Sequence, residues 1–164
     1  MKQNKSIQLA YLAGVIDSDG CISINKSKNR YHLQMLINSP DGRILDWCYG
    51  VFGGNRYFIK SSEYQENRMD VWRWEITCGK AAELCKKLIP FLRYKKQQAE
   101  VGYRFNCLIK RQNKNLPYRW ERLTEKELEQ REELYLELRK LKQIFVPCAV
   151  VETKRDKSSK DDMR

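Results

Sequence analysis

The sequence predicts an α+β fold, and two patterns carry that prediction. Stretches near the N-terminus and in the second half of the chain place apolar residues at helical spacing, and shorter stretches between them alternate apolar with polar side chains, as half-buried strands do. With 164 residues and 41% hydrophobic content, the chain is large enough to form one core. We expect one domain over residues 1–150 and a charged, disordered tail over residues 151–164.

The first element is a helix over residues 7–17, for which Ser6 stands in the N-cap position. Leu9, Leu12 and Ile16 form an apolar stripe for burial against a sheet. A second stripe at helical spacing consists of short side chains, namely Ala10, Ala13, Gly14 and Asp17. Because short side chains let another helix backbone come close, this stripe predicts an interface with a second copy of the chain.

The end of this helix carries two carboxylates, Asp17 and Asp19, followed by Gly20. We expect Gly20 to end the helix in the left-handed conformation that glycine adopts after a helix. Negative charge at a helix C-terminus is opposed by the helix dipole, and a bound cation would reverse that penalty. The acidic end of the helix is therefore a candidate metal site.

Two antiparallel hairpins are predicted from the alternating stretches, one from residues 21–26 and 31–38 and one from residues 55–60 and 71–77. A helix over residues 42–52 connects them. One face of the sheet would be apolar, with Ile22, Ile24, Leu33, Met35, Ile37, Trp72, Trp74 and Ile76. The other face would be polar. Its Arg, Lys, Asn, Gln and Glu residues are the types that bind base edges in the DNA major groove.

Helices follow the sheet. Residues 79–89 and 94–111 have apolar stripes that would cover the back of the sheet. Thr124 and Glu127 form a capping box, which opens a further helix running to about Phe145. The many charge pairs on that last helix predict a solvated outer face.

The net charge is confined to one region. Residues 1–123 hold 22 Lys and Arg against 11 Asp and Glu, which accounts for the whole net charge of +11 and favours a polyanionic partner. No stretch is long enough for a membrane span, and the polar N-terminus does not read as a signal peptide, so we expect a cytoplasmic protein, or an organellar one if the gene is organellar. The six cysteines include no C-x-x-C pair and His32 is the only histidine, which predicts free thiols rather than disulfides or zinc.

Two stretches resemble motifs of one known family. Residues 12–20 read LAGVIDSDG and resemble the LAGLIDADG motif of the homing endonucleases at all but two positions, Val15 and Ser18. The later stretch IPFLRYKKQQA resembles the P-x-L-x-x-K-x-x-Q-A segment of the same family. The element order between the two stretches agrees with the family as well, so the resemblance covers residues 7–111. The resemblance implies the element order α-β-β-α-β-β-α, with a curved antiparallel sheet, helices on one face and, here, an additional C-terminal helix.

The resemblance also implies an activity: an intron-encoded, site-specific homing endonuclease that hydrolyses double-stranded DNA as a homodimer, with Mg²⁺ or another divalent metal. Asp19 matches the family's metal-binding acid, with the Ser18 carbonyl as a second ligand. Asp17 would cap or orient the paired helices, although the reverse assignment of the two acids stays open. Lys95 matches the lysine expected near the scissile phosphate. Asn38, Ser39 and Arg43 compete for a further catalytic place, which we assign to Asn38 and Arg43.

The residues expected to contact DNA lie on the polar face of the sheet and in its turns. They are Ser23, Asn25, Ser27, Lys28, Arg30, His32, Gln34, Arg56, Lys60, Arg73 and Glu75. A noncatalytic DNA-binding regulator and an RNA maturase on the same fold stay open as alternatives.

Overall fold

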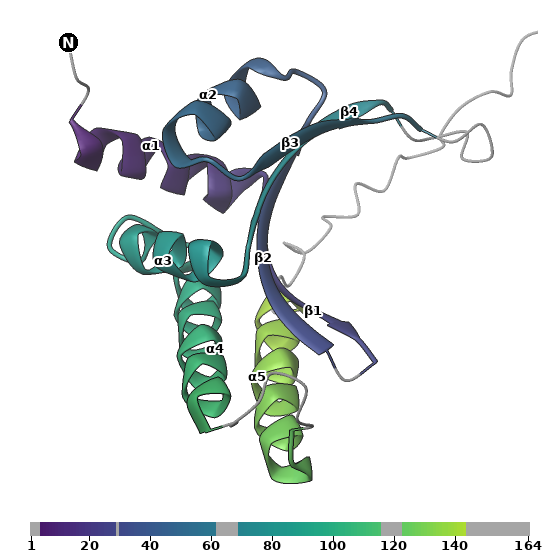
Figure 1. Cartoon of the computed structure of the whole chain (residues 1–164). Coiled ribbons are helices and arrows are strands. Elements are labelled where there is room, and N and C mark those ends of the chain that lie inside the picture. The colour runs from purple at the N-terminus through teal and green to yellow at the C-terminus, as the bar shows by residue number, and fades with distance from the viewer. Residues whose placement is uncertain (1–3, 29, 62–68, 116–122, 144–164) are drawn as a thin grey trace, which may run out of the picture.

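The computed structural model in Figure 1 describes residues 4–28, 30–61, 69–115 and 123–143. Its elements in chain order are α1 (Lys5–Ser18), β1 (Gly20–Ser27), β2 (Arg30–Ser39), α2 (Arg43–Phe52), β3 (Asn55–Ile59), β4 (Val71–Thr77), α3 (Cys78–Leu88), α4 (Lys96–Asn115) and α5 (Glu125–Gln143). The expected order of helices and strands is therefore confirmed, and the helices predicted over residues 94–111 and after Thr124 are present as α4 and α5. The predicted tail over residues 151–164 and the predicted helix end near Phe145 lie outside the described residues.

The four strands form one antiparallel sheet in the order β1-β2-β4-β3. The two hairpins are joined through their inner strands, so β2 and β4 run side by side through the middle of the sheet. Figure 1 shows these two strands bending together along their length, which gives the sheet the predicted curvature.

The sheet has one apolar face, and the helices cover it. The buried core includes Ile22, Ile24, Leu33, Met35, Ile37, Trp74 and Ile76 from the strands, together with side chains from all five helices. The alternation of the strands thus correctly separates a core face from a polar face, because neighbouring side chains of a strand point to opposite sides. The polar face has no helix packed against it among the described elements (Figure 1).

The two ends of α1 differ from the predicted details. The N-cap is Asn4 rather than Ser6, since the Asn4 side chain accepts a hydrogen bond from the backbone N–H of Ser6 at 3.1 Å. Gly20 does not adopt a positive φ and instead begins β1. Glycine is required there for another reason: a Cβ at Gly20 would lie 2.6 Å from Cα of Ile16. The chain turns from α1 into β1 within one residue, which leaves no space for a side chain.

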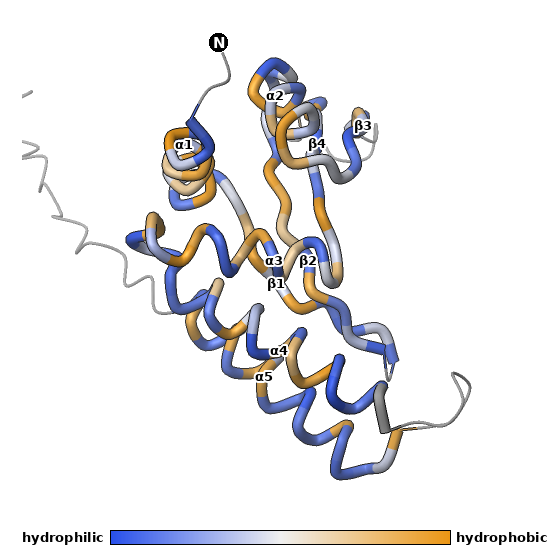
Figure 2. The backbone as a smooth tube through the Cα atoms, turned by 60° about the vertical axis from the view of Figure 1, so that its left-hand side comes forward, coloured by the Kyte–Doolittle hydropathy of each residue, from blue (hydrophilic) through white to orange (hydrophobic). Residues whose placement is uncertain are grey.

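The last helix is fastened to the rest of the chain by polar contacts. The capping box is confirmed, with the Thr124 amide donating to Glu127 at 2.9 Å and the Glu127 amide to Thr124 at 3.3 Å. The buried Arg131 donates to Gln112 of α4 at 2.7 Å. Figure 2 shows α4 and α5 side by side, with hydrophobic and hydrophilic residues interspersed along both. α5 is therefore an integral part of the domain.

Three further findings concern the cysteines, clusters of possible metal ligands and the hydropathy of the helices. The five described cysteines are free thiols, and burial raises the pKa of Cys48 and of Cys85 to about 12, so these two are inert core residues. No group of three or more His, Cys, Asp or Glu residues within the described ranges could hold a metal ion. None of the helices described here is long and apolar enough to cross a membrane.

Candidate nucleic-acid interface and metal site

The two acids at the end of α1 have different surroundings. Both oxygens of Asp17 accept hydrogen bonds from the chain that leads into α4: Oδ2 from the Arg93 amide at 2.7 Å and Oδ1 from the Lys95 amide at 2.9 Å. Asp17 therefore binds the residues that immediately precede α4, within the second motif of the same chain. The ambiguity between the two acids is reduced, because the Asp17 carboxylate is already occupied by backbone donors.

Lys95 also joins the segment before α4 to the end of α1, in this case through its side chain. Its ammonium group donates to the carbonyl oxygens of Ile16 at 2.7 Å, Asp17 at 2.9 Å and Ser18 at 3.4 Å. A cation at these carbonyls compensates the negative end of the helix dipole. Burial lowers the pKa of Lys95, and the nearby charge of Asp17 opposes that shift. The sequence places Lys95 near a phosphate, whereas the structure gives all three of its protons to the end of α1.

Asp19 is the acid that stays accessible. It is exposed, and its carboxylate accepts a hydrogen bond from the neighbouring Ser18 hydroxyl at 3.2 Å. Asp19 is the C-cap of α1, and the next residue, Gly20, begins β1 and pairs with Ile37 of β2. Asp19 therefore lies at the junction between α1 and the first strand of the sheet.

Of the two residues assigned to the further catalytic place, one, Asn38, lies on the polar face of the sheet. Asn38 pairs with Arg73, which donates from Nε to Asn38 Oδ1 at 2.8 Å, and Arg73 pairs in turn with Tyr57. Arg43 instead lies at the start of α2 and binds Asp41, with its side chain 90% exposed. The Arg43 guanidinium lowers the pKa of Asp41 to about 2.

The polar face carries a chain of hydrogen bonds that crosses the strands. Asn25 donates to Gln34 at 2.6 Å, Gln34 donates to Glu75 at 2.8 Å, and the Tyr57 hydroxyl donates to the same Glu75 carboxylate at 2.9 Å. Each of these groups has further donor or acceptor capacity. Side chains of the kinds that bind base edges therefore form a continuous row on this face.

Most of the residues predicted to contact DNA are brought together by the register. Ser23, Asn25, Ser27, Arg30, His32, Gln34, Arg73 and Glu75 all share the polar face, because they pair with one another or stand two residues apart on a strand. Lys28 is in the tight turn after β1, where its φ is 52°, and Lys60 is exposed one residue beyond β3.

Arg56 does not belong to this face, and its prediction as a DNA contact is contradicted. It pairs with the buried Trp74, which puts it on the helix side of the sheet. There its Nε lies 2.6 Å from an Asp46 oxygen in an ionic contact, and its guanidinium stacks on the Trp72 ring at 4.0 Å. The alternation in β3 alone does not indicate which of its two faces is buried, and its pairing with β4 decides this.

Sequence reasoning missed Tyr57 and Asn55 as members of the polar face. Both are exposed, and both pair with polar-face residues of β4: Asn55 with Glu75 and Tyr57 with Arg73. The prediction of Arg56 and Lys60 as DNA contacts places the even-numbered residues of this segment on the polar face, whereas the register places Asn55 and Tyr57 there. The register between β3 and β4 is the missing signal.

The open face of α1 shares only Ala10 and Gly14 with the predicted stripe, because Asp17 is bound within its own chain. Ala10 and Gly14 are exposed, together with the large side chains of Ile7 at 63% and Tyr11 at 55% exposure. Ala13 is fully buried in the core of its own chain and is unavailable to a second copy. The exposed apolar face of α1 is therefore formed by Ile7, Ala10, Tyr11 and Gly14, which are three or four residues apart and so share one side of the helix.

A curved antiparallel sheet with a bare polar face, helices on its other face and an acidic helix end beside it is the fold of the LAGLIDADG homing endonucleases. Among solved structures, the chain is similar to the homing endonuclease I-CvuI in complex with its target in the presence of calcium (18% identity, TM-score 0.62, 83% of this chain and 82% of that chain). It is also similar to the LAGLIDADG meganuclease I-AabMI bound to uncleaved DNA (19% identity, TM-score 0.55, 77% of this chain but 43% of that one).

A third similar structure is the LAGLIDADG homing endonuclease I-GzeII in complex with a DNA target (14% identity, TM-score 0.56, 80% of this chain and 43% of that one). No family model matches the sequence, and no curated protein matches it either. At these identities the fold is what the chains share.

Proposed function

We propose that this chain is a site-specific double-strand DNA endonuclease that cuts as a homodimer with a divalent metal. The observation that carries the proposal is the placement of Asp19. It is an accessible carboxylate at the junction of α1 and β1, while the neighbouring Asp17 is bound by backbone amides. The structural neighbours that are bound to DNA support the nucleic-acid partner.

The residues at this junction fit a hard divalent cation. Mg²⁺ prefers oxygen ligands, keeps several waters, and is held by one or two carboxylates together with substrate phosphates. Asp19 and the Ser18 carbonyl would hold it, and the metal would activate water and stabilise charge on the phosphate. A single chain offers one such carboxylate at this place. A symmetric pair of chains would offer two.

Asp17 and Lys95 act as positioning residues in this proposal. The Lys95 ammonium neutralises the carbonyl end of α1, and Asp17 fixes residues 93–95 against that end. Together they hold the backbone at the end of α1, which would fix the position of the following Asp19 carboxylate. A carboxylate held in place loses less conformational entropy when it binds a cation.

The exposed face of α1 supports a second copy as the partner. Exposed Ile7 and Tyr11 would be covered, and a Cβ added at Gly14 would meet no atom within 4 Å in the single chain, so a second helix has room to approach. The chain also corresponds to 43% of the length of I-AabMI and of I-GzeII, which is the share expected for one half of a longer chain. Dimerisation would place two Asp19 residues near one axis.

The polar face would supply the sequence specificity. Asn25, Gln34 and Arg73 are residue types that bind adenine or guanine edges, and Glu75 can accept from cytosine. Hydrogen bonds join Asn25, Gln34 and Glu75 to one another, and another joins Arg73 to Asn38, so these side chains are oriented before DNA binds. When DNA binds, each of these hydrogen bonds would be replaced by a hydrogen bond to a base.

The deciding experiment is incubation of the purified protein with DNA that joins the flanks of its own gene after removal of the intron, with Mg²⁺ present. We expect one double-strand cut within that junction, and none with the Asp19→Asn variant. A noncatalytic DNA-binding protein is the second candidate, because the Lys95 protons are all given to α1. It would bind the same DNA in a sequence-specific manner and leave it intact.

A further inference from the structure

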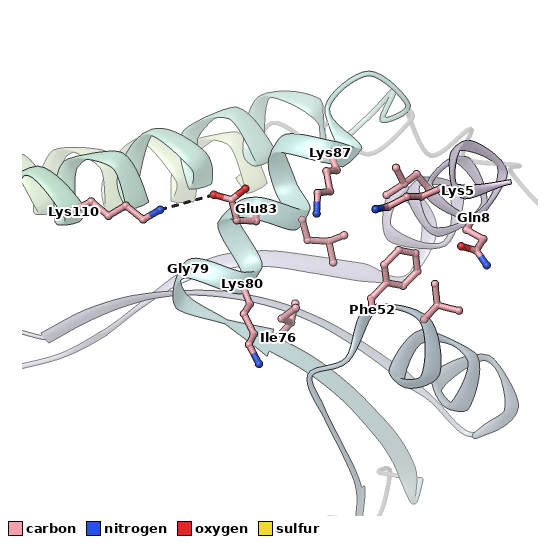
Figure 3. A pocket seen from close by; sticks show the side chains of 12 residues that line it. Lys5, Gln8, Phe52, Ile76, Gly79, Lys80, Glu83, Lys87 and Lys110 are labelled. Carbon is pink, nitrogen blue, oxygen red and sulfur yellow. Dashed lines mark ion pairs between the residues drawn. The ribbon is translucent and has the colours of Figure 1, made fainter. Parts of the chain in front are cut away.

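A groove of about 870 Å³ opens on the helix side of the molecule, remote from the polar face of the sheet. Figure 3 shows it between the first half of α1, the end of α2 and the length of α3. Its lining residues are Lys5, Gln8, Leu9, Val51, Phe52, Ile76, Gly79, Lys80, Glu83, Leu84, Lys87 and Lys110. Its volume is in the range of roughly 300–1,000 Å³ that is typical of small-molecule sites.

The floor of the groove is apolar and comes from four different elements. Ile76 of β4 and Leu84 of α3 are buried, and Leu9 of α1 and Phe52 of α2 are half-buried. These side chains belong to the core or pack against it, so the floor is fixed in position. A floor of this kind binds an aliphatic or aromatic body.

The rim of the groove is cationic. Of its four lysines, Lys110 is paired with Glu83 at 3.8 Å, and Lys5, Lys80 and Lys87 form no ion pair within the described part of the chain. In Figure 3 the ammonium ends of Lys5 and Lys87 point toward one another across the groove. Two like charges that face each other over an apolar floor repel, and an anion between them would turn that repulsion into attraction.

Neither DNA nor the second copy accounts for this groove. It includes Ile76, which points into the helix layer, whereas the proposed DNA contacts are on the opposite face of the sheet. On α1 it is lined by Lys5, Gln8 and Leu9, which point about 120–180° away from Gly14, since each residue advances the helix by about 100°. The exposed apolar face of α1 could pair with another chain and leave the groove open.

We infer that this groove is a binding site for a small amphipathic anion, with an apolar body and a carboxylate, sulfonate or phosphate head. The body lies on Leu9, Phe52, Ile76 and Leu84, and the head lies between Lys5 and Lys87. A nucleic acid would need a surface on which bases stack and phosphates run past. A recessed aliphatic floor with cations at its edge instead matches a single anionic head.

The test uses the full chain and the fluorescent probe 8-anilinonaphthalene-1-sulfonate, which combines an aromatic body with a sulfonate. We expect saturable binding of one probe per chain, displaced by decanoate but not by decylammonium, which has the same chain length and the opposite charge. The charge-reversal variant Lys5→Glu/Lys87→Glu should weaken binding about fivefold or more, because two weak surface attractions become repulsions. The matched control Lys126→Glu/Lys140→Glu, on exposed positions of α5, should bind like wild type.

A second variant tests the groove by its volume. Val51 lines the groove and is 38% exposed, so Val51→Trp can narrow it without disturbing the core, as circular dichroism would verify. This variant should also lose at least about fivefold in affinity, since the steric overlap costs roughly 1 kcal/mol or more. Excess duplex DNA should leave probe binding unchanged.

The inference is overturned by any of four results: no saturable probe binding, equal displacement by decanoate and decylammonium, wild-type affinity in both groove variants, or displacement of the probe by DNA. The last result would show that the cationic surface serves nucleic acid.

Discussion

Asp17 and Lys95 are bound to each other in both directions. The Lys95 backbone amide donates to the Asp17 carboxylate at 2.9 Å, and the Lys95 ammonium donates to the Asp17 carbonyl at 2.9 Å. This double contact joins the two segments that resemble the family motifs, although they are more than seventy residues apart in the sequence. Asp17 is therefore the acid that joins the two segments, whereas Asp19 remains accessible beside it.

The first prediction separates the roles of the two acids. Asp19→Asn should abolish cleavage while DNA binding stays within about tenfold, because the substitution removes a metal ligand and also relieves repulsion against phosphate. Asp17→Ala should lower the free energy of unfolding by about 1–3 kcal/mol, since two backbone N–H groups lose a charged acceptor. Plasmid cleavage, gel-shift and thermal melting measure these effects. Normal cutting by Asp19→Asn would remove Asp19 from the site.

The second prediction concerns Lys95 as a positioning residue. Lys95→Met should lower both thermal stability and the cleavage rate, because it removes the cation that binds the carbonyl end of α1. Lys96→Met is the matched control: Lys96 is the next residue and is exposed, so it should leave melting and cleavage near wild type. A Lys95→Met protein that melts like wild type and yet fails to cut would instead favour a direct contact with phosphate.

The third prediction concerns assembly. Gly14→Leu should separate the proposed pair of α1 helices at a cost of roughly 1–3 kcal/mol or more, because the larger side chain overpacks the contact. In the single chain a Cβ at Gly14 meets nothing within 4 Å, and the same is true of Gly50 on α2, so Gly50→Leu is the control for an exposed helical glycine. Sedimentation should show dimer for wild type and Gly50→Leu and monomer for Gly14→Leu. Wild-type protein that is monomeric at micromolar concentration would contradict the two-subunit site.

The fold could be predicted from the sequence where periodicity determines it. Alternation indicates the correct core face of β1, β2 and β4, because Ile22, Met35 and Ile76 each have an apolar residue two positions away and pair with one another across the strands. It fails in β3, where Arg56, Phe58 and Tyr57 combine apolar and polar character on both faces. Helical periodicity also wrongly assigns Ala13 to the interface between two chains. Ala13 is buried in its own chain, because a short side chain suits a close contact within a chain as well as one between chains.

The site could be predicted only in part. The motifs indicate Asp19 and Lys95 as candidate site residues. The distinction between Asp17 and Asp19 depends on the backbone amides of residues 93 and 95, which bind Asp17. No sequence pattern predicts which side chain the amides of a distant turn will bind. Arg43 likewise donates a hydrogen bond to the nearby Asp41, and this local ion pair competes with any role of Arg43 in a catalytic site.

The fourth prediction follows from this pairing between Asp41 and Arg43. Hydrogen bonds from Arg43 lower the pKa of Asp41 to about 2. The Asp41 carboxylate therefore stabilises the fold at pH values above the pKa that Asp41 has in the unfolded chain. This stabilisation is lost as the pH falls toward about 2. Arg43→Ala should raise the pKa of Asp41 toward the ordinary value of about 3.9. Side-chain carboxyl chemical shifts followed by NMR titration measure it. An unchanged pKa in the variant would show that Arg43 does not hold this acid in solution.

The fifth prediction uses two arginines on opposite faces of the sheet. Arg73 lies on the polar face, so Arg73→Ala should cost about 1–3 kcal/mol of binding and relax the preference at one base position in each half-site. Arg56 is held by Asp46 and Trp72 on the helix side, so Arg56→Ala should lower the melting temperature and leave the preferred sequence unchanged.

Binding-site selection with both variants distinguishes the two faces. If Arg56→Ala changes the preferred base and Arg73→Ala does not, DNA lies on the other side of the sheet. If wild type selects no sequence at all, specific recognition by the polar face is wrong, and the basic charge serves nonspecific or RNA binding instead.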